Sequence, residues 1–355
     1  MKLAILANES SIHTIKWANE MADRGHEVYL ISLRHNSNLP MCRKNVRQYL
    51  LPFPAPIGYY LNCLFLRSVL SKIQPDLLHT HYASGYGTLG RLSGFHPNLL
   101  SVWGSDVFEF PYQSKLKMRI IQLNILNADQ LSSTSWIMKE QTELIQKPKK
   151  DIKVIPFGVD CKQFSPKQKP HSEILRIGTI KTLEETYGIS TLIRAFSILK
   201  KQLMNTELII IGSGSQESEL KRLTNELKLE DSIKFIGSIE HSDVPKWLNS
   251  FDIFVALSNS ESFGVAVLEA SACGLPVLVS DVGGLPEVVI NGSTGFVIPK
   301  QNSMAAADKL LQMATNNALR ERMGSKGRDF VVKNYEWGKC ADQMEDLYKQ
   351  VIRDV

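Results

Sequence analysis

The sequence lacks any long hydrophobic run. None of its apolar stretches approaches the roughly 20 residues that cross a bilayer. The opening segment MKLAILANES is too short an apolar run for a signal peptide, so we predict a first β-strand there. The five cysteines are scattered, odd in number and without the spacing of metal ligands. We therefore expect a cytoplasmic protein of a reducing compartment, without a disulfide framework.

The charge is distributed unevenly along the chain. Residues 1–170 contain 21 Lys and Arg against 12 Asp and Glu, whereas residues 171–355 contain 20 against 24. A chain of 355 residues is long enough for two domains, and the change of charge indicates that they meet different partners. A basic first half fits an anionic membrane surface or an anionic acceptor, and it equally fits a solvated basic face. Nucleic-acid binding is disfavoured because the basic residues do not cluster in a known module.

Short apolar strands alternate with helical segments in both halves of the chain. KLAILAN, residues 12–25 and HEVYLISL predict a strand, a helix and a strand, which implies a parallel sheet. The alternation restarts at ILRIGTI, after the Lys-, Gln- and Pro-rich linker CKQFSPKQKPHSE. We predict an α/β fold of two doubly wound domains, 1–165 and 166–335, with ligands at the carboxyl ends of the strands in an interdomain cleft. One or two helices are expected over 336–355, and the pattern leaves open whether they pack on the first domain.

Two glutamates flank the start of a short apolar helix in the second half. Glu261 and Glu269 are eight residues apart in ESFGVAVLEASACGLP. The helix is expected to begin near residues 263–265, where its first amides and its positive dipole end favour an anion. Carboxylates on both sides can accept hydrogen bonds from hydroxyls. This arrangement suits a nucleotide diphosphate sugar, although the spacing alone also fits a capped helix with one exposed and one salt-bridged glutamate.

The wider context of this helix resembles a known family. The run ALSNSESFGVAVLEASACGLPVLVSDVGGLPEVVINGSTGFVIP resembles the donor-site signature of the retaining GT-B glycosyltransferases of family 4, also called glycosyltransferase group 1. VIPFGVDCKQFSP, RGHEVYLIS, PDLLHTH, WGSDV, GISTLIRAFSIL and LIIIGSGSQESELK resemble other motifs of that family, so the resemblance covers nearly the whole chain. It implies two Rossmann-like domains, of which the first binds the acceptor and the second binds the nucleotide sugar.

The resemblance also implies roles for individual residues. Glu261 would contact the sugar hydroxyls on the reacting face as a catalytic residue, and Glu269 would contact the ribose. Family enzymes usually need no metal, and this chain has no Asp-x-Asp pair to clamp a metal–diphosphate, so we expect no metal and no cofactor besides the donor substrate. The donor-binding residues implied in this way are Thr179, Ile239, Ser262, Phe263, Gly264, Val265 and Glu269.

One loop departs from the family pattern in its charges. The family usually has an Arg just after the glycine of the first strand of the second domain and a Lys before the next glycine. Here Thr179 and Tyr187 stand at those positions, and Lys181 is the one cation between them. We predict that Lys181 is a catalytic residue that serves the diphosphate; the alternative is an exposed loop lysine.

Acceptor-side residues are expected in the first half of the chain. Trp103 stands where many family members have a histidine, and it can stack on a sugar but cannot transfer a proton. Asp106 either orients an acceptor or a loop, or caps a helix. His13 lies in a loop without glycine and faces either the cleft or solvent. His81 is a candidate for the cleft wall, since a metal pair with His79 would have no third ligand nearby.

We therefore predict a retaining hexosyltransferase that moves a sugar from a nucleotide diphosphate donor, with UDP favoured, to a glycan or lipid-linked acceptor in polysaccharide biosynthesis. Two alternatives remain: a nucleotide-sugar epimerase of the same fold, and a non-catalytic nucleotide-sugar-binding subunit. The segments PIGYYLNCLFLRSVLSK and YQSKLKMRII combine apolar and basic residues. They are either helices that pack on the sheet or a face that contacts an anionic membrane peripherally, at its inner side.

Overall fold

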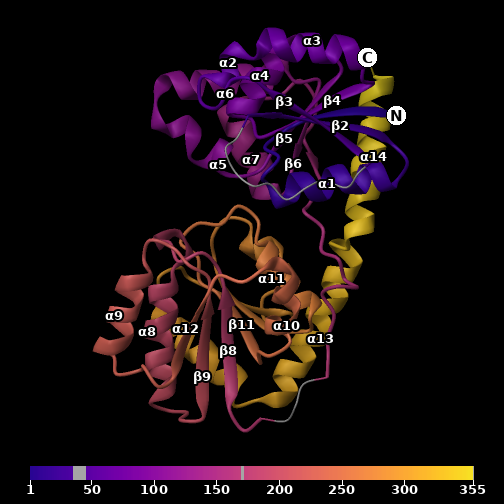
Figure 1. Cartoon of the computed structure of the whole chain (residues 1–355). Helices are drawn as coiled ribbons and strands as arrows, with labels where there is room; N and C mark the ends of the chain where they lie inside the picture. The colour runs from indigo at the N-terminus through magenta and orange to yellow at the C-terminus, as the bar shows by residue number, and fades with distance from the viewer. Residues whose placement is uncertain (35–44, 169–171, 355) are drawn as a thin grey trace. The chain divides into compact units, whose positions relative to one another are not determined.

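The computed structural model describes residues 1–34, 45–168 and 172–354. The chain forms two compact units, shown in Figure 1: unit 1 is Met1–Phe157 with Gly338–Val355, and unit 2 is Gly158–Trp337. The boundary expected after residue 165 falls inside unit 2. Within the described ranges, no helix combines the length and the hydropathy needed to span a membrane.

Unit 1 contains a parallel sheet whose described strands lie in the order β3-β2-β1-β4-β5-β6-β7. The strand order reverses between β1 and β4, which pair with each other, so this is the switch point of the sheet. β4 and β5 are buried along their whole length, as expected for parallel strands covered on both faces. The strands are β1 (Lys2–Leu6), β2 (Glu27–Leu33), β3 (Val46–Leu51), β4 (Leu77–His81), β5 (Asn98–Val102), β6 (Gln130–Ser133) and β7 (Lys153–Val154).

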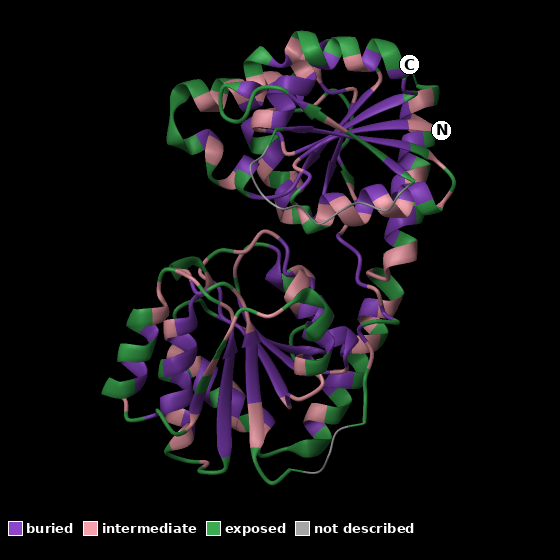
Figure 2. Cartoon of the chain, viewed as in Figure 1, coloured by how far each residue is buried: buried purple, intermediate pink, exposed green. Residues whose placement is uncertain are grey.

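Helices cover the sheet of unit 1, and Figure 2 shows their exposed outer sides against the buried strands. Leu66, Leu70 and Leu89 of α3 and α4 share one apolar cluster with Leu6 and Leu78 of the sheet. The helices are α1 (Ile12–Asp23), α2 (Gly58–Leu61), α3 (Cys63–Ile73), α4 (Gly85–Ser93), α5 (Ser105–Phe108), α6 (Lys115–Asn127), α7 (Trp136–Ile145) and α14 (Trp337–Arg353), the last of which starts in unit 2.

Unit 2 contains a second parallel sheet, with its described strands in the order β10-β9-β8-β11-β12-β13. Numbered along the unit, this is the 3-2-1-4-5-6 order of doubly wound nucleotide-binding sheets, and its switch point lies between β8 and β11. The strands are β8 (Leu175–Ile180), β9 (Thr206–Ile211), β10 (Ile233–Gly237), β11 (Ile253–Ala256), β12 (Val277–Ser280) and β13 (Gly295–Ile298).

The helices of unit 2 pack in pairs. α8 lies against α12, and α11 lies against α13. Phe196 and Leu192 of α8 are fully buried in a cluster with Leu208 and Val255 of the sheet and Leu310 of α12. The helices are α8 (Ile189–Lys200), α9 (Glu217–Glu226), α10 (Val244–Leu248), α11 (Val265–Ala272), α12 (Ser303–Ala314) and α13 (Asn317–Asn334).

The predicted α/β fold of two doubly wound parallel sheets is confirmed. The alternation predicted most of the strands, the helices α1, α8, α9 and α10, and the helix after Glu261. It did not predict β3, β13, α4, α7, α12 or α13. The segment 98–108 forms strand β5 followed, after Trp103 and Gly104, by the short helix α5.

The last helix, α14, is a single helix that packs on unit 1. Arg24, just after α1, links the two helices through its guanidinium. It donates to Asp342 Oδ1 at 2.7 Å, to Glu345 Oε2 at 3.0 Å and to the carbonyl oxygen of Gly338 at 3.1 Å. These bonds hold the first turns of α14 against the end of α1.

A buried hydrogen-bond chain fixes the other end of α14. Tyr348 is fully buried, and its hydroxyl lies 2.8 Å from Nδ1 of His79 in β4. Nε2 of His79 lies 2.6 Å from Oγ of Ser101 in β5. Burial lowers the pKa of His79 to about 3, so the imidazole is neutral at neutral pH. The helix is therefore joined to the centre of the sheet by a polar contact that water does not reach.

Replacing Tyr348 with Phe should lower the free energy of unfolding by about 1–2 kcal/mol, because a buried ring nitrogen of His79 loses its partner. Urea denaturation measures the change. The exposed Gln343 of the same helix provides the control, and Gln343→Ala should change stability by less than about 0.5 kcal/mol. Equal stability of Tyr348→Phe and the wild type would show that the hydroxyl does not anchor the helix.

Candidate active site

Two loops of unit 2 meet at the switch point of its sheet. The first follows β8 and begins with Lys181, and the second follows β11 and contains Glu261. Because β8 and β11 are parallel neighbours, both loops leave the same edge of the sheet. This edge is where doubly wound sheets bind their ligands.

Lys181 and Glu261, the two residues predicted to be catalytic, are in direct contact. Nζ of Lys181 forms an ion pair with Oε2 of Glu261, and both side chains are nearly nine-tenths buried. Oγ of Ser258 donates to the same carboxylate oxygen at 3.4 Å. Nζ of Lys181 also lies 4.7 Å from the centre of the Tyr187 ring, which is a cation–π distance. Lys181 is thus not an exposed loop lysine, while its catalytic role remains a prediction.

Backbone hydrogen bonds join the two loops around this ion pair. The amide of Asn259 donates to the carbonyl oxygen of Thr186 at 2.7 Å. The side-chain amide of Asn259 donates to the carbonyl oxygen of Glu185, also at 2.7 Å. On the other side, Gly212 has φ +136°, and a Cβ there would overlap the carbonyl oxygen of Lys181. The backbone that carries Lys181 is therefore fixed from both sides.

Helix α11 begins at the turn after Glu261. Gly264 is its N-cap with φ +111°, and the amides of Val267 and Leu268 donate to its carbonyl oxygen. A Cβ on Gly264 would lie 2.9 Å from Cδ2 of Leu285, so glycine is needed for both conformation and space. The helix starts at Val265, within the range predicted, and its first turn is directed at the loop that contains Glu261.

Two neighbouring glycines, Gly283 and Gly284, pack against the turn that contains Glu261. The amide of Gly284 donates to the carbonyl oxygen of Glu261 at 3.0 Å. Gly283 has φ +50°, and a Cβ there would overlap that carbonyl oxygen. The segment VGGLP after β12 therefore approaches the Glu261 turn as closely as two backbones can.

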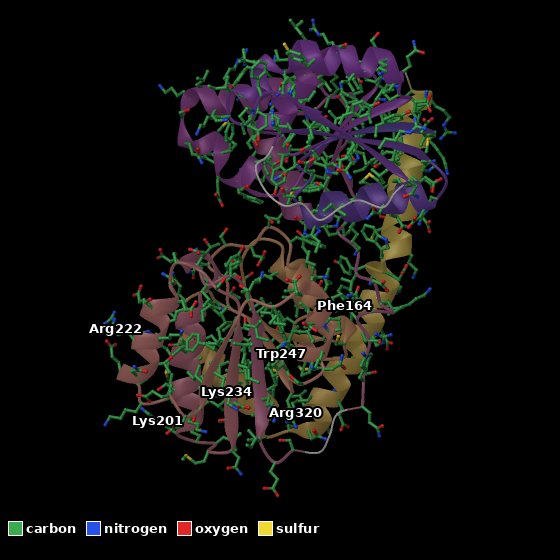
Figure 3. The ribbon with its side chains drawn as sticks, viewed as in Figure 1. Phe164, Lys201, Arg222, Lys234, Trp247 and Arg320 are labelled. Atoms are coloured by element: carbon green, nitrogen blue, oxygen red, sulfur yellow. The ribbon has the colours of Figure 1, made fainter. Side chains whose placement is uncertain are left out.

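Glu269 lies one and a half turns into α11 and is nine-tenths buried. Its Oε1 is 3.0 Å from Nε2 of His241, in the 3₁₀ turn that follows β10. Phe164, labelled in Figure 3, packs against the His241 ring with the ring centres 5.7 Å apart. His241 is a site residue that the sequence pattern did not predict. The one indication was an imidazole two residues after Ile239, a predicted donor-binding residue.

Thr179 and Ile239 complete the predicted donor-binding residues outside α11 and its turn. Thr179 lies in β8, is fully buried, and its hydroxyl has no hydrogen-bond partner among the described residues. Ile239 is half-buried in the segment between β10 and the His241 turn. Ser262 and Phe263 precede Gly264 in the Glu261 turn, with Phe263 buried. Contact of these residues with a donor remains a prediction.

The predicted acceptor-side residues gather at the switch point of unit 1. His13 is the second residue of α1 and not, as predicted, a loop residue. His81, predicted as a cleft-wall residue, ends β4 and is fully buried, and Trp103 follows β5. The ring centres of His81 and Trp103 are 4.3 Å apart, and those of His13 and Trp103 are 6.2 Å apart. Phe157 stacks on His13 at 4.2 Å and meets Trp103 at 5.1 Å. The structure thus brings three of the four predicted residues into one aromatic cluster, joined by Phe157.

His81 is neutral and fully enclosed within this cluster. Burial lowers its pKa well below the ordinary value, with further contributions from His79 and His13. Nδ1 of His81 lies 3.4 Å from Oγ1 of Thr14. A neutral buried imidazole cannot place positive charge on a phosphate at neutral pH. Both ring nitrogens of His79 are already hydrogen-bonded, which argues against a metal pair of His79 and His81.

Asp106 orients a loop. Its carboxylate is buried and accepts hydrogen bonds from the backbone amides of Ala83 at 2.7 Å, Gly104 at 2.8 Å and Trp103 at 3.1 Å. Burial raises its pKa, and the three amides act in the opposite direction. Of the roles considered for Asp106, the structure supports orientation of the loop that carries Trp103.

Two family models match separate parts of the chain. The model described as glycosyl transferases group 1 matches residues 162–330, and the model described as glycosyl transferase 4-like matches residues 2–135. The first match contains Lys181, Glu261 and Glu269. The second contains the aromatic cluster residues of unit 1 other than Phe157.

Curated relatives and solved structures agree with these matches. The chain is 26% identical to N-acetyl-alpha-D-glucosaminyl L-malate synthase of Bacillus anthracis over 356 residues, which covers 94% of this chain and 92% of the relative. It is 30% identical to phosphatidyl-myo-inositol mannosyltransferase of Mycobacterium leprae over 169 residues, which covers 47% of this chain and 44% of the relative.

The fold is shared with structures of low sequence identity. Sucrose-phosphate synthase of Thermosynechococcus elongatus has a TM-score of 0.85 at 22% identity, with all of both chains covered. HepE of Anabaena, solved in complex with UDP-glucose, has a TM-score of 0.80 at 18% identity and covers 99% of this chain and 100% of its own. These structures show a GT-B fold. Because the two glycosyltransferase family models match residues 2–135 and 162–330, the chain belongs to the group 1 glycosyltransferases and is a glycosyltransferase enzyme.

Proposed function

We propose that the enzyme transfers a sugar, with retention of anomeric configuration, from a UDP-sugar to a hydroxyl of a glycan or lipid-linked acceptor in polysaccharide biosynthesis. It acts in the cytoplasm, in peripheral contact with an anionic membrane. Unit 2 binds the donor and unit 1 binds the acceptor. No metal or cofactor takes part.

The arrangement around α11 supports donor binding by unit 2. The first amides of α11 and its dipole stabilise the diphosphate. Glu269 accepts hydrogen bonds from the ribose hydroxyls, and His241 orients its carboxylate. Ile239 and the backbone beside it meet the base. UDP is favoured because the HepE structures of similar fold are complexes with UDP or UDP-glucose.

Lys181 supplies the positive charge that a metal supplies in other glycosyltransferases. As the bond between the anomeric carbon and the diphosphate oxygen breaks, negative charge develops on the leaving oxygen. The Lys181 ammonium is held at the switch point by Tyr187 and by Glu261, ready to meet this charge. The acceptor oxygen bonds to the anomeric carbon on the same face, and its proton leaves with the diphosphate or to water. Glu261 holds the sugar hydroxyls on that face.

The acceptor class is supported by the names of relatives and by the aromatic cluster of unit 1. Relatives in the family are named for transfer to phosphatidylinositol and for capsular polysaccharide biosynthesis. Trp103 is 8% exposed, and an aromatic ring of this kind can stack on a sugar where it reaches the surface. His13 lies beside it, and Asp106 fixes the loop that carries it. We therefore favour a sugar-containing acceptor.

One observation carries the proposal: Lys181 and Glu261 meet beside the first turn of the helix that contains Glu269. A cation, an anion-binding helix end and two hydroxyl acceptors are then present within one loop cluster. This combination matches the charge and hydroxyl pattern of a nucleotide diphosphate sugar.

A panel of UDP-glucose, UDP-N-acetylglucosamine, GDP-mannose and ADP-glucose should contain one donor that raises the melting temperature, since a ligand that binds only the folded state stabilises it. At a concentration about 100-fold above Kd, the expected rise is about 5–10 °C. Glu269→Ala should lose most of this rise. The matched control Glu219→Ala removes an exposed carboxylate of α9 and should keep it.

The melting temperature of Glu269→Ala without donor shows whether the variant is folded. If the folded variant keeps the full donor-induced rise, the proposed position of the nucleotide beside Glu269 is wrong. If no nucleotide sugar stabilises the wild type, donor binding by this chain is excluded at the concentrations used.

Lys181→Gln should lower the rate of UDP release by about 100- to 1000-fold, because the charge on the leaving group loses its cation. The donor-induced rise in melting temperature should fall far less, since the helix end and Glu269 remain. Tyr187→Phe keeps the ring beside the ammonium and should retain activity, whereas Tyr187→Leu should lower kcat.

If Lys181→Gln releases UDP at the wild-type rate, Lys181 has no catalytic role. Each rate is measured with and without a glycan acceptor. An altered sugar nucleotide formed from the donor alone would identify an epimerase instead of a transferase.

A further inference from the structure

One short segment of unit 1 concentrates exposed apolar side chains. Seven large hydrophobic residues between positions 50 and 65 are each 39–67% exposed, although they lie within 16 residues of one another. Isolated exposed apolar residues are normal, but a contiguous group marks a surface that binds something. We call this group the 50–65 face; it consists of Leu50, Phe53, Ile57, Tyr60, Leu61, Leu64 and Phe65.

The 50–65 face is a fixed part of the fold. Leu66 and Leu70 of α3 are buried in the core cluster, so the opposite side of this helix must point outward. The side chain of the buried Asn62 accepts from the amide of Phe53 at 3.2 Å and donates to its carbonyl oxygen at 2.8 Å. The Phe53 and Phe65 rings meet edge to face with their centres 5.8 Å apart. Figures 1 and 2 show α3 at the top of unit 1, with exposed residues along its outer side.

Along the chain, the charged residues that neighbour the 50–65 face have one sign. The sequence contains no Asp or Glu between Glu27 and Asp76. Further along α3, Arg67 and Lys72 are exposed. The guanidinium of Arg67 donates to the carbonyl oxygens of Leu92 at 2.7 Å and Ser93 at 2.9 Å, which fixes its position on the surface.

The acidic residues nearest to the 50–65 face along the chain are Glu27 and Asp76, and the carboxylate of each has a partner elsewhere. Glu27 begins β2, at the far end of the strand from Leu33 and Leu51, and it forms an ion pair with Arg47. Asp76 follows α3, and its Oδ2 accepts a hydrogen bond from the amide of Lys2. The apolar residues of the face are therefore accompanied by cations and not by carboxylates.

We propose that the 50–65 face docks on the surface of an anionic bilayer. Aromatic and aliphatic side chains enter the headgroup region, while Arg67 and Lys72 meet the lipid phosphates. A protein partner of the same size would be expected to offer carboxylates to these two cations, but a bilayer supplies both the apolar depth and the negative charge. The inference deepens the proposed function, because it names the surface through which unit 1 would reach a lipid-linked acceptor.

The other segment expected at a membrane is less suited. Around α6, Tyr112 and Leu116 are exposed beside Lys115, Lys117 and Arg119. This surface has three basic residues against two exposed apolar ones. It therefore fits a solvated basic face that assists the electrostatic attraction of the protein to an anionic membrane.

Co-sedimentation of the full chain with vesicles tests the proposal. The protein should bind vesicles of phosphatidylcholine with phosphatidylglycerol, and should bind pure phosphatidylcholine vesicles more weakly. The triple variant Ile57→Ser, Leu61→Ser, Leu64→Ser should lower the partition coefficient about tenfold or more. The control variant Met204→Ser, Ile290→Ser, Met304→Ser removes three equally exposed apolar residues of unit 2 and should bind as the wild type does.

The proposal is overturned if the wild type does not sediment with anionic vesicles, or if both triple variants lose binding equally. It is also overturned if the wild type forms a dimer in gel filtration that the 50–65 variant alone abolishes without a change in vesicle binding. Donor-induced stabilisation is measured on the same preparations without lipid. It should be equal in all three proteins, so failure of membrane docking is distinguishable from failure of donor binding.

Discussion

Lys181 and Glu261 lie 80 positions apart in the sequence, yet their side chains form one nearly buried ion pair. The contact exists because β8 and β11 are neighbours in a parallel sheet, so the loops after both strands leave the same edge. Either charge alone would be poorly solvated at this depth, and losing one partner of such a pair is strongly destabilising. The turn before α11, the glycines at 283 and 284, and the Tyr187 ring all surround this contact. The position of the Glu261 turn therefore depends on this ion pair, whereas the start of α11 is held by Gly264 and Glu269 is held by His241.

The same edge-of-sheet principle organises unit 1, with different chemistry. There the residues that meet at the switch point are aromatic rings and imidazoles, of which His81 is neutral, and the buried carboxylate of Asp106 binds backbone amides. Unit 2 has an ion pair at its switch point, whereas unit 1 has aromatic rings there, of which His81 and Trp103 are buried. The proposed function assigns a charged nucleotide to unit 2 and a sugar-containing acceptor to unit 1.

Much of the fold and part of the site could be predicted because their signals are local. The alternation of strands and helices determines a doubly wound sheet, and parallel strands place the loops after β8 and β11 at one edge. Glu261, Gly264 and Glu269 lie within one turn and one helix, so their relation follows from helix geometry. Lys181 could be singled out because it is the only cation of its loop.

Other features depend on contacts between distant parts of the chain. His241 and Glu269 are 28 residues apart, and no local pattern indicates that the turn after β10 reaches α11. The burial of Thr179 and the three amides bound by Asp106 are set by neighbouring strands and loops. The 50–65 face was ambiguous for the same reason, since an apolar helix in sequence does not show which of its sides the sheet covers.

The position of α14 has a consequence for how the protein is made. Unit 1 begins at the first residue but includes residues 338–354, so Tyr348 can reach His79 only after all of unit 2 has been synthesised. During translation, unit 2 therefore has its complete set of strands before unit 1 receives its final helix. Until then the His79 ring lacks its Tyr348 partner on the nascent chain, and unit 1, whose synthesis begins before that of unit 2, is completed after it.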